Sequence, residues 1–202
     1  AAHELQTPLA VCMNKLELLS EHPDCTEDQL KEIAGLHQAL NGIIRLNKSL
    51  LLLSRIDNKQ FPETRDICLN HLIHKILEGI NDIYERKALH LRVSEKESLV
   101  CTMNESLATT LITNLIKNAY VHNYEKGDIG ITISRRMLTI ANTGIDKTLD
   151  KELLFARFAS QSKQQESTGL GLAIVKSIVD LYSIRIDYQY ANGMHTFTLL
   201  FY

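Results

Sequence analysis

Apolar positions in the first third of the chain recur at steps of three and four residues, the spacing of one face of a helix. This pattern predicts two helices within residues 1–58, separated by a break at 22–24 that contains a proline. Thr26 followed by Gln29 matches a capping box and predicts where the second helix begins. The apolar stripe of the first helix consists of Leu5, Leu9, Cys12, Leu16 and Leu19.

The second helix carries two apolar stripes, which a single two-helix hairpin is too small to bury. One stripe consists of Leu30, Ile33, Leu40, Ile44 and Leu51, and the other of Leu36, Ile43, Leu46, Leu50 and Leu53. Two copies of the hairpin can pair as a four-helix bundle that buries both stripes. We therefore expect a homodimer that forms through the N-terminal hairpin.

The periodicity changes after residue 58. Residues 59–66 are polar and contain Pro62, which predicts a linker between a helical hairpin domain at 1–60 and a second domain at 67–202. In the second domain the pattern predicts helices near 69–88, 105–122 and 169–182, and strands near 90–94, 98–103, 128–134, 137–142, 184–190 and 195–202. This order predicts an α+β protein whose second domain is an α/β sandwich, an antiparallel-rich sheet with helices on one face.

Two polar sites within the second domain predict local structure. Asn104 precedes the helix near 105–122 and is expected to cap it. Asn192 and Gly193 lie between the last two strands and predict a tight hairpin turn, because both residue types tolerate positive φ.

Composition and charge exclude several classes of function. The 202 residues carry a net charge of −2, without the basic excess typical of nucleic-acid-binding proteins. No apolar run approaches the roughly 20 residues of a membrane span, so we expect no membrane contact from this stretch. The four cysteines lack C-x-x-C spacing, which argues against a zinc site and favours reduced thiols in a cytosolic protein. Residues 1–3 already lie in a helical pattern without a start signal, so we expect the chain to be part of something longer.

His3 and Glu4 form the first motif with candidate chemistry. A neutral imidazole is a good nucleophile, and an adjacent carboxylate can accept its ring proton. Pro8 lies inside the helical pattern and is expected to bend the helix beside them. A metalloprotease motif would need a second histidine at position 7, which is Thr7. A solvated surface pair of His and Glu is the ordinary alternative.

Three further motifs lie in the second domain. Asn114 and Asn118 are four residues apart on one helix face, and a carboxamide oxygen suits a hard cation such as Mg²⁺. Gly169 and Gly171 precede an apolar helix and allow its N-terminus to approach a phosphate. A strand ends in the polar turn 142–144. Each motif also has a plain explanation, as solvent-facing amides, a glycine-containing loop or a strand end.

Together and in this order, the motifs closely resemble those of the sensor histidine kinases of two-component signalling. The segments similar to the H, N, G1, F and G2 boxes of that family are residues 3–9, 114–118, 142–144, 154–158 and 168–172. The resemblance implies a dimerisation and phosphoacceptor hairpin followed by an ATP-binding domain of the Bergerat type. It also implies autophosphorylation with ATP, transfer to an Asp in the receiver domain of a response regulator, and phosphatase activity toward that regulator. The implied location is the cytoplasmic portion of a protein anchored in the bacterial inner membrane.

The resemblance also implies roles for individual residues. His3 would accept the γ-phosphoryl group, Glu4 would act as the adjacent base, and Thr7 would orient water in the phosphatase reaction. The implied cofactors are ATP and Mg²⁺, with Asn118 as the metal ligand and residues 146–168 as a lid over the nucleotide. The implied nucleotide-binding residues are Asn114, Asn118, Asn142, Gly144, Thr168, Gly169, Leu170, Gly171 and Leu172.

The chain departs from the family pattern at three positions. The G1 box normally begins with Asp, whose carboxylate accepts a hydrogen bond from the adenine amino group, and here Asn142 stands there. The loss of charge assistance predicts weaker ATP binding by about 1 kcal/mol. Asp146 replaces the second glycine of that box, and Val121 replaces a residue that is often basic.

There are two alternatives to an active kinase, and the departures at Asn142 and Asp146 motivate the first of them. One is a degenerate, kinase-like dimeric signalling module with little or no turnover. The other is an ATPase of the same Bergerat fold, such as a chaperone or topoisomerase domain. That second class places a water-activating Glu one turn before the metal-binding Asn, where this chain has Asn114, a poor base. His122, one turn beyond Asn118, is a further candidate to approach the nucleotide.

Overall fold

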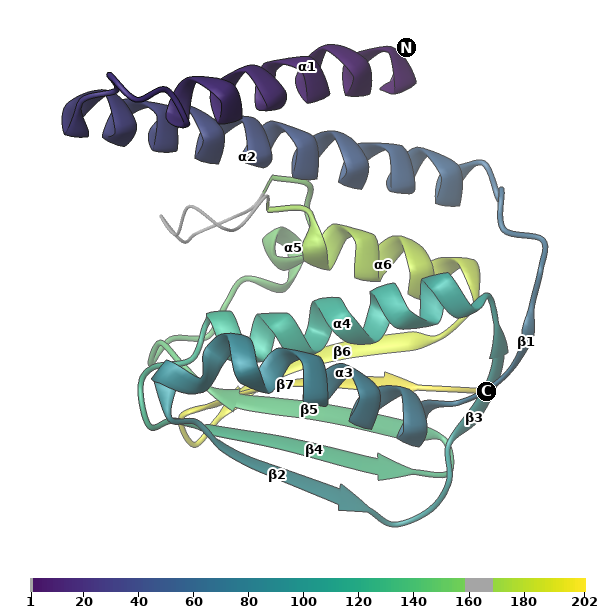
Figure 1. Cartoon of the computed structure of the whole chain (residues 1–202). Coiled ribbons are helices and arrows are strands. Elements are labelled where there is room, and N and C mark those ends of the chain that lie inside the picture. The colour runs from purple at the N-terminus through teal and green to yellow at the C-terminus, as the bar shows by residue number, and fades with distance from the viewer. Residues whose placement is uncertain (1, 159–168) are drawn as a thin grey trace.

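The N-terminal part of the protein is a hairpin of two long helices. The computed structural model describes residues 2–158 and 169–202, and for residues 2–4 and 81 it describes the backbone alone. The hairpin consists of α1 (Ala2–Ser20) and α2 (Glu27–Asp57) (Figure 1). The capping box is confirmed: Gln29 N donates to Thr26 Oγ1 at 3.3 Å, and Thr26 N donates to Gln29 Oε1 at 2.9 Å.

The second part is built on a five-stranded sheet with the strand order β2-β4-β5-β7-β6. The strands are β2 (His90–Glu95), β4 (Asp128–Ser134), β5 (Met137–Thr143), β6 (Arg185–Ala191) and β7 (Met194–Leu200). β2 pairs with β4 in parallel, and the other neighbours are antiparallel. Burial alternates along β4 and β7, as expected for a sheet that has one covered face.

Three helices cover that face of the sheet (Figure 1). They are α3 (Leu69–Tyr84), which continues into the short 3₁₀ helix η1 (Glu85–Lys87), α4 (Glu105–Val121) and α6 (Gly171–Leu181). The predicted cap at Asn104 is confirmed, because its side chain accepts from the backbone N–H groups of Ser106 at 3.0 Å and Leu107 at 3.2 Å. The predicted fold class, a helical region followed by a sheet with helices on one face, is therefore confirmed.

The structure differs from the sequence-based prediction in three elements. β1 (Arg65–Cys68) begins inside the predicted linker and pairs with β3 (Val100–Met103), and the pairing depends on a segment remote in sequence. The short helix α5 (Lys151–Leu154) was not predicted. α6 begins at Gly171 rather than at 169, because Gly169 has φ 68°, a left-handed conformation that does not continue a helix.

The hairpin contacts the sheet domain through α2 and α6. Leu53 and Ile56 of α2 are buried in the same apolar core as the sheet and its helices. Beside them, Arg157 Nη2 lies 3.0 Å from Asp57 Oδ2. α1 packs on the outer side of α2, so α2 lies between α1 and α6 (Figure 1).

Much of the remaining apolar surface of the hairpin is exposed. The exposed large apolar side chains of α1 and α2 are Leu5, Val11, Leu18, Leu19, Leu30, Leu36, Ile43 and Leu50. An apolar surface of this extent on a small helical unit is typical of a protein–protein contact.

Within the described part of the chain, no helix is both long and apolar enough to cross a membrane.

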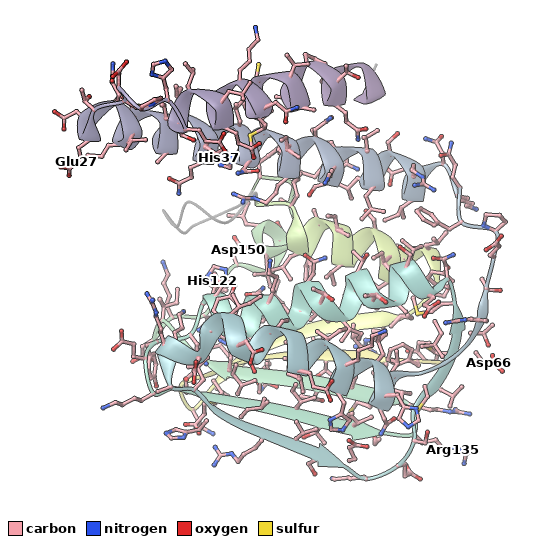
Figure 2. All side chains as sticks on the ribbon, viewed as in Figure 1. Glu27, His37, Asp66, His122, Arg135 and Asp150 are labelled. Atoms are coloured by element: carbon pink, nitrogen blue, oxygen red, sulfur yellow. The ribbon has the colours of Figure 1, made fainter. Side chains whose placement is uncertain are left out.

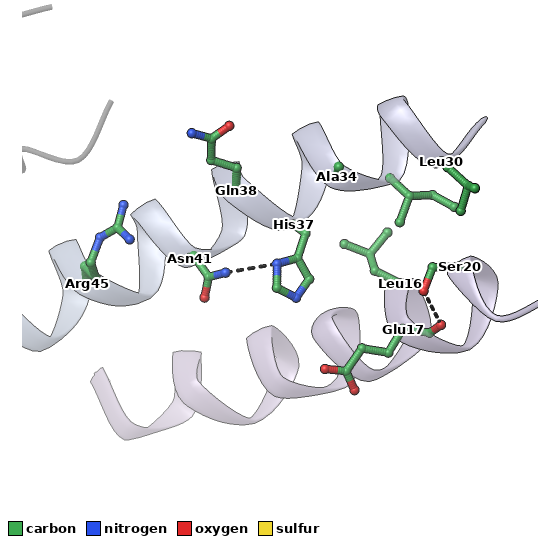
Figure 3. A pocket seen from close by; sticks show the side chains of 10 residues that line it. Leu16, Glu17, Ser20, Leu30, Ala34, His37, Gln38, Asn41 and Arg45 are labelled. Carbon is green, nitrogen blue, oxygen red and sulfur yellow. Dashed lines mark hydrogen bonds between the residues drawn. The ribbon is translucent and has the colours of Figure 1, made fainter. Parts of the chain in front are cut away.

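An open pocket of about 510 Å³ lies between α1 and α2 (Figure 3). In it, Asn41 Nδ2 donates a hydrogen bond to His37 Nδ1 at 3.0 Å. None of the residues that line this pocket belongs to the predicted nucleotide site. The pocket is therefore a feature of the hairpin surface and not of the site described next.

Candidate functional site

The asparagine motif and the glycine motif meet where α4 faces the beginning of α6. Asn114 and Asn118 lie on one face of α4 and are both partly buried. Asn114 Nδ2 donates to the carbonyl oxygen of Thr110 at 2.9 Å, which orients the carboxamide. A Cβ placed on Gly171 would lie 2.9 Å from Asn114 Oδ1, so α6 approaches α4 more closely than a side chain at 171 would allow.

The C-terminal end of α4 is held by a lysine from a neighbouring element. Lys87 Nζ donates to the carbonyl oxygens of Tyr120 at 3.0 Å, Val121 at 2.8 Å and Asn123 at 3.0 Å. A cation at this place satisfies carbonyl groups that have no partner within the helix and complements the helix dipole. Lys87 thus fixes the end of the helix that carries Asn118. No sequence motif marks Lys87 for this role, because the contact joins segments that are far apart in the chain.

Asn142, at the end of β5, presents a free acceptor. The residue is buried, and its Nδ2 donates to the carbonyl oxygen of Thr143 at 2.8 Å. Its Oδ1 accepts no hydrogen bond from any residue that the structure describes. The Asn118 carboxamide likewise has no hydrogen-bond partner among the described residues, which leaves both groups available to a ligand.

The backbone at Gly144, just after β5, packs closely against the C-terminal end of α4. A Cβ at Gly144 would lie 3.0 Å from the carbonyl oxygen of His122 and 3.0 Å from Cδ2 of the buried His195. Figure 2 shows His122 at the C-terminal end of α4, beside the sheet domain's loops. The pKa of His122 is lowered, first by desolvation within the surrounding protein although part of the residue is exposed, and then by the nearby Lys87 and His195. A neutral imidazole therefore borders the site near pH 7.

The remaining predicted site residues have different positions. The side chains of His3 and Glu4, and all of Thr168, lie outside the described residues. Thr7 is exposed on α1, which α2 separates from α6. Leu170 is fully buried in the core, so only its backbone is available to a ligand. Leu172 packs partly buried against the same core.

Two family models together match most of the chain. Residues 1–59 match the His Kinase A (phospho-acceptor) domain, and residues 103–201 match the histidine kinase-, DNA gyrase B- and HSP90-like ATPase. The chain belongs to the histidine kinase family. The sequence resemblance is thereby confirmed, including the order of a phosphoacceptor domain followed by an ATPase-type domain.

Curated relatives align along almost the whole length of this chain. The chain is 33% identical over 210 residues to the heme sensor protein HssS of Staphylococcus saprophyticus. This alignment covers 99% of the chain and 45% of HssS. The chain is 28% identical over 206 residues to the sensor histidine kinase HprS of Escherichia coli. That alignment covers 98% of the chain and 45% of HprS. The chain thus spans less than half the length of these relatives.

Solved histidine kinase structures share the fold. Full-length ShkA in complex with AMPPNP superposes with a TM-score of 0.75 at 17% identity, covering 100% of this chain and 45% of ShkA. The Acinetobacter baumannii histidine kinase AdeS superposes with a TM-score of 0.67 at 21% identity, covering 98% of this chain and 95% of that one. At these identities the likeness concerns the fold alone.

Proposed function

We propose that the chain is the catalytic core of a sensor histidine kinase that phosphorylates His3 with ATP and passes the phosphoryl group to an Asp of a response regulator. Residues 1–60 form its dimerisation and phosphoacceptor domain, and residues 67–202 its ATP-binding domain. The observation that carries this proposal is the contact between Asn114 and Gly171, which brings the asparagine and glycine motifs into one site. A regulator phosphatase activity that uses Thr7 is part of the same proposal.

Asn142 is the residue that would recognise adenine. Its free Oδ1 can accept a hydrogen bond from the exocyclic amino group of the base, while its Nδ2 is engaged by Thr143. A neutral amide gives a weaker hydrogen bond than the carboxylate found at this position in the family, so we expect affinity lower by about 1 kcal/mol than with Asp. ATP would reach from there to the beginning of α6, whose free N–H groups favour phosphate.

The residues present fit Mg²⁺ as the metal. Among the described residues, no group of three or more His, Cys, Asp or Glu side chains is placed to hold a metal ion. Mg²⁺ does not need such a cage, because it commonly binds one or two protein oxygens and takes its other ligands from water and substrate phosphates. The carboxamide of Asn118, which has no hydrogen-bond partner within residues 2–158 and 169–202, can supply that oxygen. When bound, Mg²⁺ neutralises phosphate charge.

The transfer step follows from the chemistry of the phosphoacceptor. A neutral ring nitrogen of His3 forms the bond to the γ-phosphorus, the bond from that phosphorus to the bridging oxygen breaks, and ADP leaves. Glu4 accepts the proton of the other ring nitrogen. Positioning and charge neutralisation, rather than covalent catalysis by the ATP-binding domain, lower the barrier.

Transfer also requires movement or a second copy. α1 carries His3 on the outer side of α2, whereas the nucleotide motifs lie on the side of α6. The ATP-binding domain therefore has to swing on the segment 59–66, or reach the phosphoacceptor of another protomer. The exposed apolar stripes of α1 and α2 provide the surface for a homodimer that pairs as a four-helix bundle.

The test is incubation with γ-labelled ATP and Mg²⁺. We expect acid-labile, base-stable label on the wild type, and none on His3→Gln or Asn118→Ala. His90→Gln, a substitution of an exposed histidine on β2, is the matched control and should be labelled like the wild type. Undiminished label on His3→Gln would refute the assignment of the phosphoacceptor. A folded wild type that binds ATP but takes up no label would instead favour the degenerate signalling module.

A further inference from the structure

The loop that follows β5 is tied to β6 and β7 at two points by one chain of hydrogen bonds. The N–H group of Leu149 donates to the Tyr188 hydroxyl at 3.3 Å, and that hydroxyl lies 2.8 Å from Nδ1 of His195. Nε2 of His195 lies 2.8 Å from the carbonyl oxygen of Ile145. An amide N–H only donates and a carbonyl only accepts, so Leu149 N–H donates to the Tyr188 hydroxyl and Nε2 of His195 donates to the Ile145 carbonyl oxygen. In the tautomer that carries its proton on Nε2, His195 accepts at Nδ1 from the Tyr188 hydroxyl.

His195 also lies directly beside Asn142 and Gly144, the candidate residues for binding the base. It is buried, it pairs with Asn142 across β5 and β7, and its ring lies where a Cβ on Gly144 would approach to 3.0 Å. The Tyr190 ring packs on the His195 ring, with centroids 4.7 Å apart, and its hydroxyl donates to Asp146. That bond raises the pKa of Tyr190 to about 12. Asp146, which replaces a family glycine, thus becomes a further tie between the loop and β6.

The orientation of the Asn142 amide decides which base it can bind. Adenine presents an amino donor at its six position, and guanine presents a carbonyl acceptor there. An asparagine could serve either base by turning its amide, whereas an aspartate could only accept. Here Nδ2 already donates to the Thr143 carbonyl oxygen, so Oδ1 is the atom left for the ligand. That orientation lasts only as long as the backbone at residues 143–145 stays in place.

We propose that Tyr188 and His195 are positioning residues that set base selectivity by holding the backbone at Thr143–Ile145, and with it the acceptor orientation of Asn142. The inference rests on the proposed function, since it concerns the same ATP site. His195 anchors the Ile145 carbonyl, and Tyr188 holds His195 in the tautomer that can do so. A prearranged acceptor binds adenine without the cost of ordering the loop. If this chain of hydrogen bonds is loosened, the Asn142 amide can turn and donate a hydrogen bond to the carbonyl group of guanine.

The deciding variant is Tyr188→Phe, which removes the hydroxyl and keeps the ring on Phe197, with centroids 5.2 Å apart. Tyr182→Phe is the matched control, because its hydroxyl also accepts a backbone N–H group, that of Asn104 at 3.0 Å, at the opposite end of α4. His195→Gln is a rescue variant, since its amide retains a donor for the Ile145 carbonyl. The readout is the ratio of the dissociation constants for ATP and GTP, measured by calorimetry with Mg²⁺.

We expect Tyr188→Phe to weaken ATP binding about five-fold, the effect of one lost neutral hydrogen bond, and to leave GTP binding unchanged or tighter. Tyr182→Phe should leave the ratio within about two-fold of the wild type, and His195→Gln should lie nearer to the wild type than His195→Phe. An unchanged ratio, or equal losses for both nucleotides, would overturn the inference and leave the proposed function standing. A wild type that binds no ATP would overturn both.

Discussion

The carboxamide of Asn114 fills the space that a side chain on Gly171 would need. A Cβ at residue 171 would stand 2.9 Å from Oδ1, closer than real Cβ contacts allow. The carboxamide is not free to move away, because Nδ2 is bonded to the Thr110 carbonyl oxygen. A side chain at residue 171 would therefore have to displace the Asn114 carboxamide and break that hydrogen bond, so the packing of α6 on α4 favours glycine here.

We expect Gly171→Ala to lower the free energy of unfolding by about 1–2 kcal/mol, as overpacked sites do, and to weaken ATP binding. Urea denaturation and nucleotide titration measure the two effects. Gly79→Ala in α3 is the control: nothing lies within 4 Å of its Cβ position, so the better helix propensity of alanine should stabilise it by about 0.5–1 kcal/mol. Adding Asn114→Ala to Gly171→Ala should recover stability, and no recovery would argue against the steric explanation.

Lys87→Met should destabilise the end of α4. The variant keeps most of the side-chain stem and removes three hydrogen bonds to helix-end carbonyls. Burial lowers the pKa of Lys87, so desolvation already offsets part of the gain, and we expect a net loss of about 1–2 kcal/mol. Lys75→Met, at an exposed position of α3, should change the unfolding free energy by less than about 0.5 kcal/mol. Equal effects of the two variants in urea denaturation would contradict the capping role.

The ion pair between Asp57 and Arg157 links the hairpin to the sheet domain beside the buried Leu53 and Ile56. Both side chains are about half exposed, so a double-mutant cycle of Asp57→Asn and Arg157→Gln should give a coupling energy below about 1 kcal/mol that falls as salt is added. The proposed swing of the ATP-binding domain on the segment 59–66 would open this contact first, so on that route the Asp57→Asn variant should also be phosphorylated faster. Asp82→Asn, on the exposed face of α3, is the control. A slower Asp57→Asn enzyme would mean that the contact belongs to the active arrangement.

His122 should make the folded protein less stable in mild acid. Its pKa is lowered in the folded state, so below about pH 6.5 the unfolded chain binds more protons than the folded one. Stability is therefore retained above the unfolded pKa and is lost as the pH falls below it. We expect wild-type protein to lose more stability between pH 7.5 and pH 5.5 than His122→Gln does, as measured by urea denaturation. The same loss in both proteins would assign the acid sensitivity to other groups.

Local patterns in the sequence were sufficient for most elements of the fold. The capping box at Thr26, the cap at Asn104 and the turn at Asn192-Gly193, where both φ values are positive, were predicted because the residues that form each feature are neighbours in the chain. The histidine kinase resemblance rested on the order of its boxes and was confirmed by the family matches. The roles of His3 and Glu4, like the whole candidate site, stay predictions.

Contacts between remote segments could not be predicted in this way. The strand β1, the three carbonyls that Lys87 binds and the chain of bonds from Leu149 to Ile145 each join segments that meet only after folding. Residue type indicates what a side chain can donate or accept, and periodicity indicates which face of an element it occupies. Which partner a side chain meets depends on how the sheet brings β5, β6 and β7 together, and this decides that His195 is buried beside the candidate site and not on the surface.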